Sequence, residues 1–422
     1  MITISDIKKQ ISVSSARSVV EEAIAKAEKN SDYNAILNLT AERALERADA
    51  VDAGKITGKL AGVPFVVKDN FMAFGAPSTA ASKMLQNYMT PIQATSVEKL
   101  EAEGAICIGK SNLDAFAHGG STENSAYGPT KNAYDKQRVA GGSSGGSAVV
   151  TALDIVPFAL GSDTGGSIRQ PASFNGVVGV KPTYGTISRF GVVAMASSTD
   201  VIGSFTNNIE DAELITQIMS GRDKKDMTTL PDFFEPKELD KKLTIGVISD
   251  FMTDGVDADV RKNVTEYIER LKSAGHVIKN VSLPMAEYAL AIYYILVPAE
   301  LSSNLARYDG IRYGLRDKTA KTLAELYGKT RDIGFETENK RRIMIGSYVL
   351  SSGFFDAYYL QAQKARTLLI NQFNDLFASC DVLIGPVAPT TSFKIGENSS
   401  DPIKMYLGDI MTVPTSIAGF TI

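Results

Sequence analysis

The sequence of 422 residues predicts an α/β fold with a doubly wound core. Residues 62–70 (GVPFVVKDN) form a short β-branched run typical of a buried strand. Residues 95–104 (TSVEKLEAEG) have a helical pattern and lead into a second strand at 105–109 (AICIG). The alternation of strand and helix returns after Leu243. Such alternation is typical of a sheet with helices packed on its faces.

The first 60 residues predict charged helices. Ser14 or Ser15 is a candidate N-cap, because spaced Val, Ala and Ile residues follow in the pattern of an amphipathic helix. The segment has no continuous apolar stretch of the kind found in signal peptides, so we expect no leader.

Glycine and serine dominate residues 111–205, with the runs HGGSTENSAYG, VAGGSSGGSAVV and GSDTGGSIRQPASFNG. Glycine weakens helices and strands. We therefore expect the alternation to break here, and the backbone of this region to serve a function.

The second half of the chain resumes the α/β pattern. It predicts a strand at 243–250, a helix at 257–275, a strand at 276–284, mainly helices from 285 to 380, and a strand with a loop in CDVLIGPVAP. The expected division has four parts: a helical segment at 1–60, a catalytic core at 61–205, an α/β continuation with a helical insertion at 206–380, and the end of the core at 381–422.

Composition excludes several classes of protein. The chain has 44 Lys and Arg against 48 Asp and Glu, which argues against strong nucleic-acid binding by this chain alone. Two Cys cannot form a disulfide framework, and two His leave few options for a zinc site. Free Cys107 and Cys380 fit a reducing compartment. The most apolar stretch, 286–300, is short for a bilayer. We expect a cytoplasmic protein.

The Gly/Ser loops first suggest phosphate binding or a nucleophile elbow. Gly141–Gly146 and Gly161–Gly166 have the glycine spacing of a P-loop, but serine stands where that motif needs lysine. The elbow motif needs a preceding strand and a later histidine base, and the only later histidine, His276, lies in a plain strand–helix–strand pattern. Both interpretations are disfavoured.

Lys68 is a charged residue in an apolar strand, and two interpretations stay open. Its side chain can reach water from the strand end. Alternatively, burial lowers the pKa of its amine, so that the neutral amine can accept a proton from a serine hydroxyl.

Three segments together resemble the amidase signature family, namely the strand with Lys68, GGSSGGS at 141–147 and GSDTGGSIRQPA at 161–172. Their combined spacing is specific, although each loop alone is not. The resemblance implies the amidase-signature fold, which is a mixed central β-sheet covered by helices on both faces.

The resemblance also implies a Ser–cis-Ser–Lys triad. Ser167 would be the nucleophile, Ser143 the bridging hydroxyl after a cis peptide bond, and Lys68 the base. Asp163 and Arg169 are interpreted as a structural ion pair. The oxyanion would be stabilised by four consecutive backbone amides, those of Thr164, Gly165, Gly166 and Ser167.

Two segments resemble the glutamine-hydrolysing subunits of tRNA-dependent amidotransferases, namely 291–314 and 341–369. This resemblance implies that Arg342 binds the α-carboxylate of glutamine and Asp409 its α-amino group, with Tyr293 or Tyr294 nearby. Without it, Arg342 would be interpreted as a solvated surface residue and Asp409 as a helix residue.

The implied function is glutamine hydrolysis with transfer of ammonia to a partner. The resemblance implies a heterotrimer with B and C subunits, no cofactor in this chain, and ATP and Mg²⁺ at the partner, which would also bind most of the aminoacyl-tRNA. No membrane partner is expected. The alternatives are a stand-alone amidase acting on another small or acyl amide, and a non-catalytic scaffold for partner subunits.

The sequence departs from the family in two places. The family usually continues for some tens of residues after the segment matching TVPTSIAG, whereas this chain ends at GFTI, so we expect a truncated end of the core. His118 stands where the family commonly has methionine, and the sequence assigns it no function.

Overall fold

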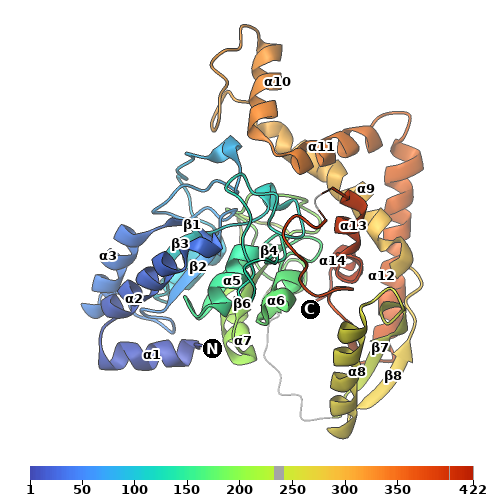
Figure 1. The fold of residues 1–422 in the computed structure, drawn as a ribbon, viewed down its shortest axis with the longest axis horizontal. Helices are drawn as coiled ribbons and strands as arrows, with labels where there is room; N and C mark the ends of the chain where they lie inside the picture. Colours follow the sequence, from blue (N-terminus) through green and yellow to red (C-terminus); the bar gives the residue numbers. More distant parts are fainter. Residues whose placement is uncertain (232–241, 399, 422) are drawn as a thin grey trace.

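A computed structural model describes residues 1–231, 242–398 and 400–421, and Figure 1 shows its arrangement. The first part is built on a six-stranded sheet. Three adjacent strands, which are the second, third and fourth across the sheet, run parallel to one another. The remaining neighbouring pairs are antiparallel, so the sheet is mixed as expected. Its order is β1 (Ile36–Leu39), β3 (Ile106–Ser111), β2 (Pro64–Lys68), β4 (Phe158–Asp163), β6 (Val201–Thr206) and β5 (Val178–Val180).

Helices cover both faces of this sheet. Side chains alternate along a strand, so Val66 belongs to the apolar cluster on one face, and Phe65 and Val67 to the cluster on the other. The cluster that contains Val66 also includes residues of α2 (Ala16–Lys29), α3 (Ala41–Asp52) and α5 (Gly145–Ala152). The cluster on the other face includes residues of α1 (Ile4–Val13), α4 (Thr95–Ala102) and α7 (Ile209–Met219). The predicted α/β class is confirmed.

The N-terminal helices follow the expected capping signals. The Ser15 side chain accepts a hydrogen bond from the Ser18 amide at the start of α2, which confirms one of the two candidate caps. A separate helix, α1, precedes it and is capped by Thr3. The expectation of helices alone was wrong for β1, which pairs antiparallel with β3 at the edge of the sheet.

The second part of the chain contains a parallel sheet of three strands and most of the long helices (Figure 1). The predicted strand–helix–strand unit is confirmed. Residues 232–241 of the expected third part lie outside the described residues. The strands are β8 (Val277–Val281), β7 (Thr244–Ile248) and β9 (Val382–Ile384), and the helices are α8 (Ala258–Ser273), α9 (Ala286–Asn304), α10 (Leu323–Gly334), α11 (Thr337–Val349), α12 (Gln361–Phe377), α13 (Pro402–Leu407) and α14 (Val413–Ala418).

The alternation breaks as expected over residues 112–144, where the only helical structure is the 3-10 turn Ala115–Ala117, but contrary to the expectation it resumes within the Gly/Ser-rich region. This region has a series of helices and strands from residue 145 onward. It contains α5, β4, a further helix α6 (Arg169–Asn175), β5 and the start of β6. Here glycine allows close packing, which outweighs its low propensity. A Cβ atom on Gly146 in α5 would lie 2.4 Å from the carbonyl oxygen of Ala35, closer than side-chain carbons approach.

The apolar segment that contains α9 is longer than the sequence suggests. Helical structure continues through Ala286–Arg307, so the expectation that it is too short to cross a bilayer was wrong on length. Half of its apolar window is buried within the chain, where Ile292 and Leu296 join the largest core cluster. α9 packs against α11 and α12. This is the arrangement of a core helix.

Candidate active site

The candidate catalytic residues meet at one edge of the six-stranded sheet. β2 ends at Lys68 and its parallel neighbour β4 ends at Asp163. Because parallel strands end at the same edge, Lys68 lies beside Ser162. Ser143 lies just before α5, which packs against β4. The carboxyl ends of strands are where α/β proteins usually place their sites.

Lys68 is fully buried, so the interpretation that it reaches water was wrong. Its Nζ lies 2.8 Å from the Oγ of Ser143, and it lies 3.0 Å from the Oγ and 3.2 Å from the carbonyl oxygen of Ser162. Burial lowers the pKa of Lys68 to about 7, against the opposing effect of nearby carboxylates. The amine can therefore be neutral at physiological pH and accept a proton from Ser143.

Ser143 and Ser167 lie on adjoining loops. The Gly142–Ser143 peptide bond is cis, as the resemblance implies. The amide of Ser144 donates to the carbonyl oxygen of Ser167 at 3.2 Å. Ser143 is fully buried, and Ser167 is 7% exposed. The described residues include no direct hydrogen bond between the two hydroxyls. The structure thus places Lys68 against Ser143 and brings the two serine loops together. The hydroxyls of Ser143 and Ser167 are not hydrogen-bonded to each other in the described chain.

The loop of Thr164 to Ser167 is fixed by its neighbours. The Thr164 hydroxyl donates to Asp200 at 2.7 Å, and the Gly166 amide donates to Asp163 at 2.9 Å. A Cβ atom on Gly165 would lie 2.7 Å from the ring of Tyr293, so only glycine fits beneath that ring. Because the Gly166 amide already donates to Asp163, it is not free to bind a further acceptor. Within the described chain the other three amides of the loop donate to no protein acceptor.

Asp163 and Arg169 form the structural ion pair that the sequence predicts. Arg169 Nη2 lies 2.9 Å from Asp163 Oδ1, and Arg169 Nε lies 3.0 Å from Oδ2, with both side chains buried. Burial opposes ionisation of Asp163, but the guanidinium outweighs it and lowers the pKa of Asp163 to about 2. Arg169 also donates to the carbonyl oxygen of Thr412 at 2.8 Å. The pair anchors the loop to the C-terminal segment.

A cavity of about 320 Å³ lies near these loops. It is lined by Arg342 and Asp409, the two residues predicted to bind the α-carboxylate and the α-amino group of glutamine. Asp114, on its wall, donates its amide to the carbonyl oxygen of Ser143 at 3.2 Å. The Thr412 hydroxyl lies 2.6 Å from the carbonyl oxygen of Gly165 and 3.1 Å from that of Asp409. Hydrogen bonds therefore tie the cavity wall to both serine loops, although Ser143 and Ser167 are not among the residues that line the cavity.

Arg342 is buried on this wall, so the interpretation of a solvated surface residue was wrong. Its Nε donates to Glu338 at 2.8 Å, and its guanidinium lies 5.2 Å from the ring centroid of Tyr294. Asp409 lies in a turn rather than in a helix. Its carboxylate has no partner among the described side chains, and burial raises its pKa to about 7. Tyr294 lines the cavity, whereas Tyr293 packs on Gly165 in the Thr164–Ser167 loop.

Sequence reasoning missed several residues that position this site. Ser162 holds the Lys68 amine, Asp200 holds Thr164, and the Gln170 side chain accepts from the Gly142 amide at 2.8 Å. Ser162 stands inside the motif GSDTGGS and could have been found there. Gln170 likewise stands inside the longer motif GSDTGGSIRQPA, whereas Asp200 lies outside the motifs and had no signal.

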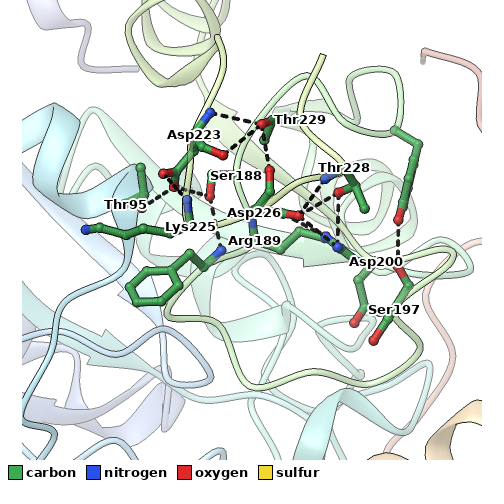
Figure 2. A network of polar contacts seen from close by, with 12 residues as sticks. Thr95, Ser188, Arg189, Ser197, Asp200, Asp223, Lys225, Asp226, Thr228 and Thr229 are labelled. Atoms are coloured by element: carbon green, nitrogen blue, oxygen red, sulfur yellow. Dashed lines mark hydrogen bonds and ion pairs between the residues drawn. The ribbon is translucent and has the colours of Figure 1, made fainter. Parts of the chain in front are cut away.

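A smaller cavity of about 200 Å³ is lined in part by Asn70, Asp200 and Ser162, the residue whose hydroxyl contacts the Lys68 amine. Figure 2 shows a polar network that includes Arg189 and Asp226, which also line this cavity. There Arg189 Nε lies 3.0 Å from Asp226 Oδ2, and Asp223 accepts from hydroxyls of neighbouring segments. The network fixes the loop that carries Asp200. Within the described residues no group of three or more His, Cys, Asp or Glu side chains could hold a metal ion.

Sequence comparisons agree with the geometry. The amidase family model matches residues 18–422. The chain is 51% identical over 432 residues to the A subunit of the glutamyl-tRNA(Gln) amidotransferase of Gloeobacter violaceus, and the match covers 99% of this chain and 88% of that protein. It is 52% identical to the protein of the same name from Thermoanaerobacter pseudethanolicus, over 92% of this chain and 81% of the relative.

Solved structures extend the similarity to the fold. The A subunit of the glutamyl-tRNA(Gln) amidotransferase from Thermotoga maritima has a TM-score of 0.81 and 35% identity, covering 100% of this chain and 86% of that one. A structure described as an amidase has a TM-score of 0.83 and 30% identity, with coverage of 100% and 91%. The resemblance predicted from Lys68 and the two Gly/Ser loops is confirmed: the chain belongs to the amidase family.

Proposed function

We propose that this chain is the glutamine-hydrolysing A subunit of a glutamyl-tRNA(Gln) amidotransferase. The observation that carries the proposal is a cavity beside the Lys68–Ser143 pair with a cation, Arg342, and an unpartnered carboxylate, Asp409. An α-amino acid has the complementary charges, because a guanidinium binds a carboxylate and a carboxylate accepts from an ammonium group. The names of relatives about half identical in sequence support the same assignment.

In the proposed mechanism, neutral Lys68 accepts the proton of Ser143 while Ser143 accepts that of Ser167. The Ser167 oxygen forms a bond to the carboxamide carbon, and the free amides of Thr164, Gly165 and Ser167 stabilise the oxyanion. The carbon–nitrogen bond then breaks, and the proton returns from Lys68 through Ser143 to the nitrogen, which leaves as ammonia. Water hydrolyses the glutamyl ester and restores the Ser167 hydroxyl.

The ammonia would be used by a partner subunit rather than released. In this proposal the B and C subunits complete a cytoplasmic heterotrimer, and the partner binds aminoacyl-tRNA, ATP and Mg²⁺ and converts glutamyl-tRNA(Gln) to glutaminyl-tRNA(Gln). The names of the relatives, which describe one subunit of a larger enzyme, support this division of labour.

A stand-alone amidase of the same family is the second candidate. The 30% identical amidase structure favours it, since that protein shares the fold over the whole of this chain. The Lys68 and Ser143 geometry fits both candidates equally. The two candidates differ in whether Arg342 and Asp409 bind the α-carboxylate and the α-amino group of the substrate.

Replacing Arg342 with alanine should raise the KM for glutamine about 100-fold and leave hydrolysis of butyramide within about threefold. Hydrogen bonds to charged groups contribute about 1.5–3 kcal/mol, and butyramide has no α-carboxylate to lose them. The measurement is ammonia release over a range of each amide. Lys340→Ala is the matched control, because Lys340 lies on the same helix and pairs with Asp332 instead. Equal losses on both substrates would favour the stand-alone amidase.

Asp409 predicts a pH dependence that is specific for glutamine. Burial raises its pKa to about 7, so the carboxylate that accepts from the α-ammonium group is depleted below that pH. The ratio of kcat/KM for glutamine to that for butyramide should therefore rise with pH between 6 and 8. Any titration of Lys68 affects both substrates and cancels in this ratio. Asp409→Asn should lower the ratio and flatten it, and a ratio independent of pH in the unmodified protein would contradict the assignment.

A further inference from the structure

The wall of the substrate cavity contains a buried histidine that the mechanism does not use. His118 follows a short 3-10 turn at Ala115–Ala117 and is fully buried. It lines the same cavity as Arg342 and Asp409. Its Nδ1 atom is in contact with the side-chain amide of Asn339, which lies on α11 one turn before Arg342. The histidine therefore lies beside the helix that carries the predicted carboxylate-binding residue.

The surroundings fix which nitrogen of His118 carries the proton. The Asn339 side-chain oxygen accepts from the Glu336 amide at 3.2 Å, and its side-chain nitrogen donates to the Ala115 carbonyl oxygen at 2.9 Å. The amide is thus oriented with its nitrogen toward the imidazole, and Nδ1 of His118 must accept. Burial, with a further effect of Arg342, holds the pKa of His118 well below its usual range, so the ring is neutral. A neutral ring has one proton, which must be on Nε2.

The Nε2–H group has no acceptor in the described part of the chain, and the atom is buried. A buried donor without a partner costs about 1–3 kcal/mol, so such groups usually meet a ligand or a water molecule. The positive charge of Arg342 is close enough to disfavour protonation of the ring. Two hydrogen-bond donors, one charged and one neutral, therefore belong to the same region of the cavity. This arrangement suits an anion.

We infer that His118 is a specificity-determining residue, whose Nε2–H donates a hydrogen bond to the substrate carboxylate that Arg342 binds. The identity of that ligand as an α-amino acid amide rests on the proposed function. His118 binds the carboxylate of the substrate and takes no part in the chemistry at Ser167. A merely structural histidine would tie its loop to Asn339 and would not distinguish one amide substrate from another.

Substitution separates these two roles. His118→Met removes the donor at similar volume and should raise the KM for glutamine roughly 10- to 100-fold, with kcat and butyramide hydrolysis little changed. His118→Gln keeps an N–H near the position of Nε2 and should stay within about fivefold of the original KM. Equal effects of His118→Met on both substrates, or an unchanged glutamine KM, would overturn the inference.

A direct measurement uses the fact that the chain has only two histidines. In Ser167→Ala protein labelled with ¹⁵N-histidine, glutamine should shift the Nε2–H resonance of His118. His276, whose Nδ1 accepts from the Leu243 amide far from the cavity, is the internal control and should not move. Butyramide should leave both resonances in place. Glutamine binding measured by calorimetry without a His118 shift overturns this inference alone, whereas no binding of glutamine at all overturns the proposed function and the inference with it.

Discussion

Replacing Ser167 with alanine should reduce ammonia release from glutamine, and equally from butyramide, by at least about 10⁴-fold. The hydroxyl forms the only covalent bond to the substrate in the proposed mechanism, and loss of a nucleophile of this kind removes nearly all catalysis. The fold should persist, because the Ser167 hydroxyl makes no hydrogen bond within the described chain and the substitution removes one oxygen atom. The measurement is coupled ammonia release, with the unfolding midpoint of each variant compared.

Ser147 provides the matched control for this variant. It follows the other glycine motif and is fully buried, but its hydroxyl contacts Ser111 at 2.7 Å and the Leu160 carbonyl oxygen at 2.8 Å on the inner side of α5. Ser147→Ala should lower stability and keep turnover within about threefold of the original. Activity retained by Ser167→Ala, or lost equally in both variants, would remove Ser167 as the nucleophile.

Replacing Lys68 should have the second largest effect, a loss of at least about 10³-fold in kcat for every amide. Lys68→Arg is the most informative substitution, because it keeps a positive charge and a long side chain but cannot become neutral in the physiological range. The arginine variant should therefore be as inactive as Lys68→Ala. Near-normal turnover by Lys68→Arg would show that the site needs a cation rather than a base.

The pKa of Lys68 in the free enzyme also sets the pH dependence of kcat/KM. Burial lowers that pKa to about 7, and only the neutral amine accepts the Ser143 proton. The value of kcat/KM for butyramide should therefore rise about tenfold per pH unit below 7 and level off above it. With glutamine the rise should be steeper, because Asp409 ionises in the same pH range. A rate that falls as pH rises through 7 would contradict the role of Lys68 as base.

The sequence predicted the elements whose pattern is local. The β-branched run ending at Lys68, the helix at 95–104 and the strand–helix–strand unit after Leu243 all formed as expected. β1 was missed because its four residues (ILNL) stand between charged helices and gain their structure by pairing with β3. The elements from α5 onward in the Gly/Ser-rich region were missed for a related reason, since glycines such as Gly146 make close contacts with distant backbone.

The candidate site divides in the same way. Lys68, Ser143 and Ser167 stand in motifs whose spacing could be recognised, and the structure places Lys68 on Ser143. Arg342 and Asp409 were found only through the resemblance, because nothing near them in the sequence shows that they share a cavity. Ser162, although 94 positions from Lys68, supports it through a contact that exists only once β2 and β4 pair. Sequence spacing therefore identifies the candidate catalytic residues better than the residues that position them.

The most direct test of the account is ammonia release from glutamine by the purified chain together with its candidate partner subunits, beside the Ser167→Ala variant. We predict release that depends on Ser167 and increases when aminoacyl-tRNA and ATP are supplied to the complex. Turnover of simple amides without any release from glutamine, with or without the partners, would contradict the proposed function and leave a stand-alone amidase.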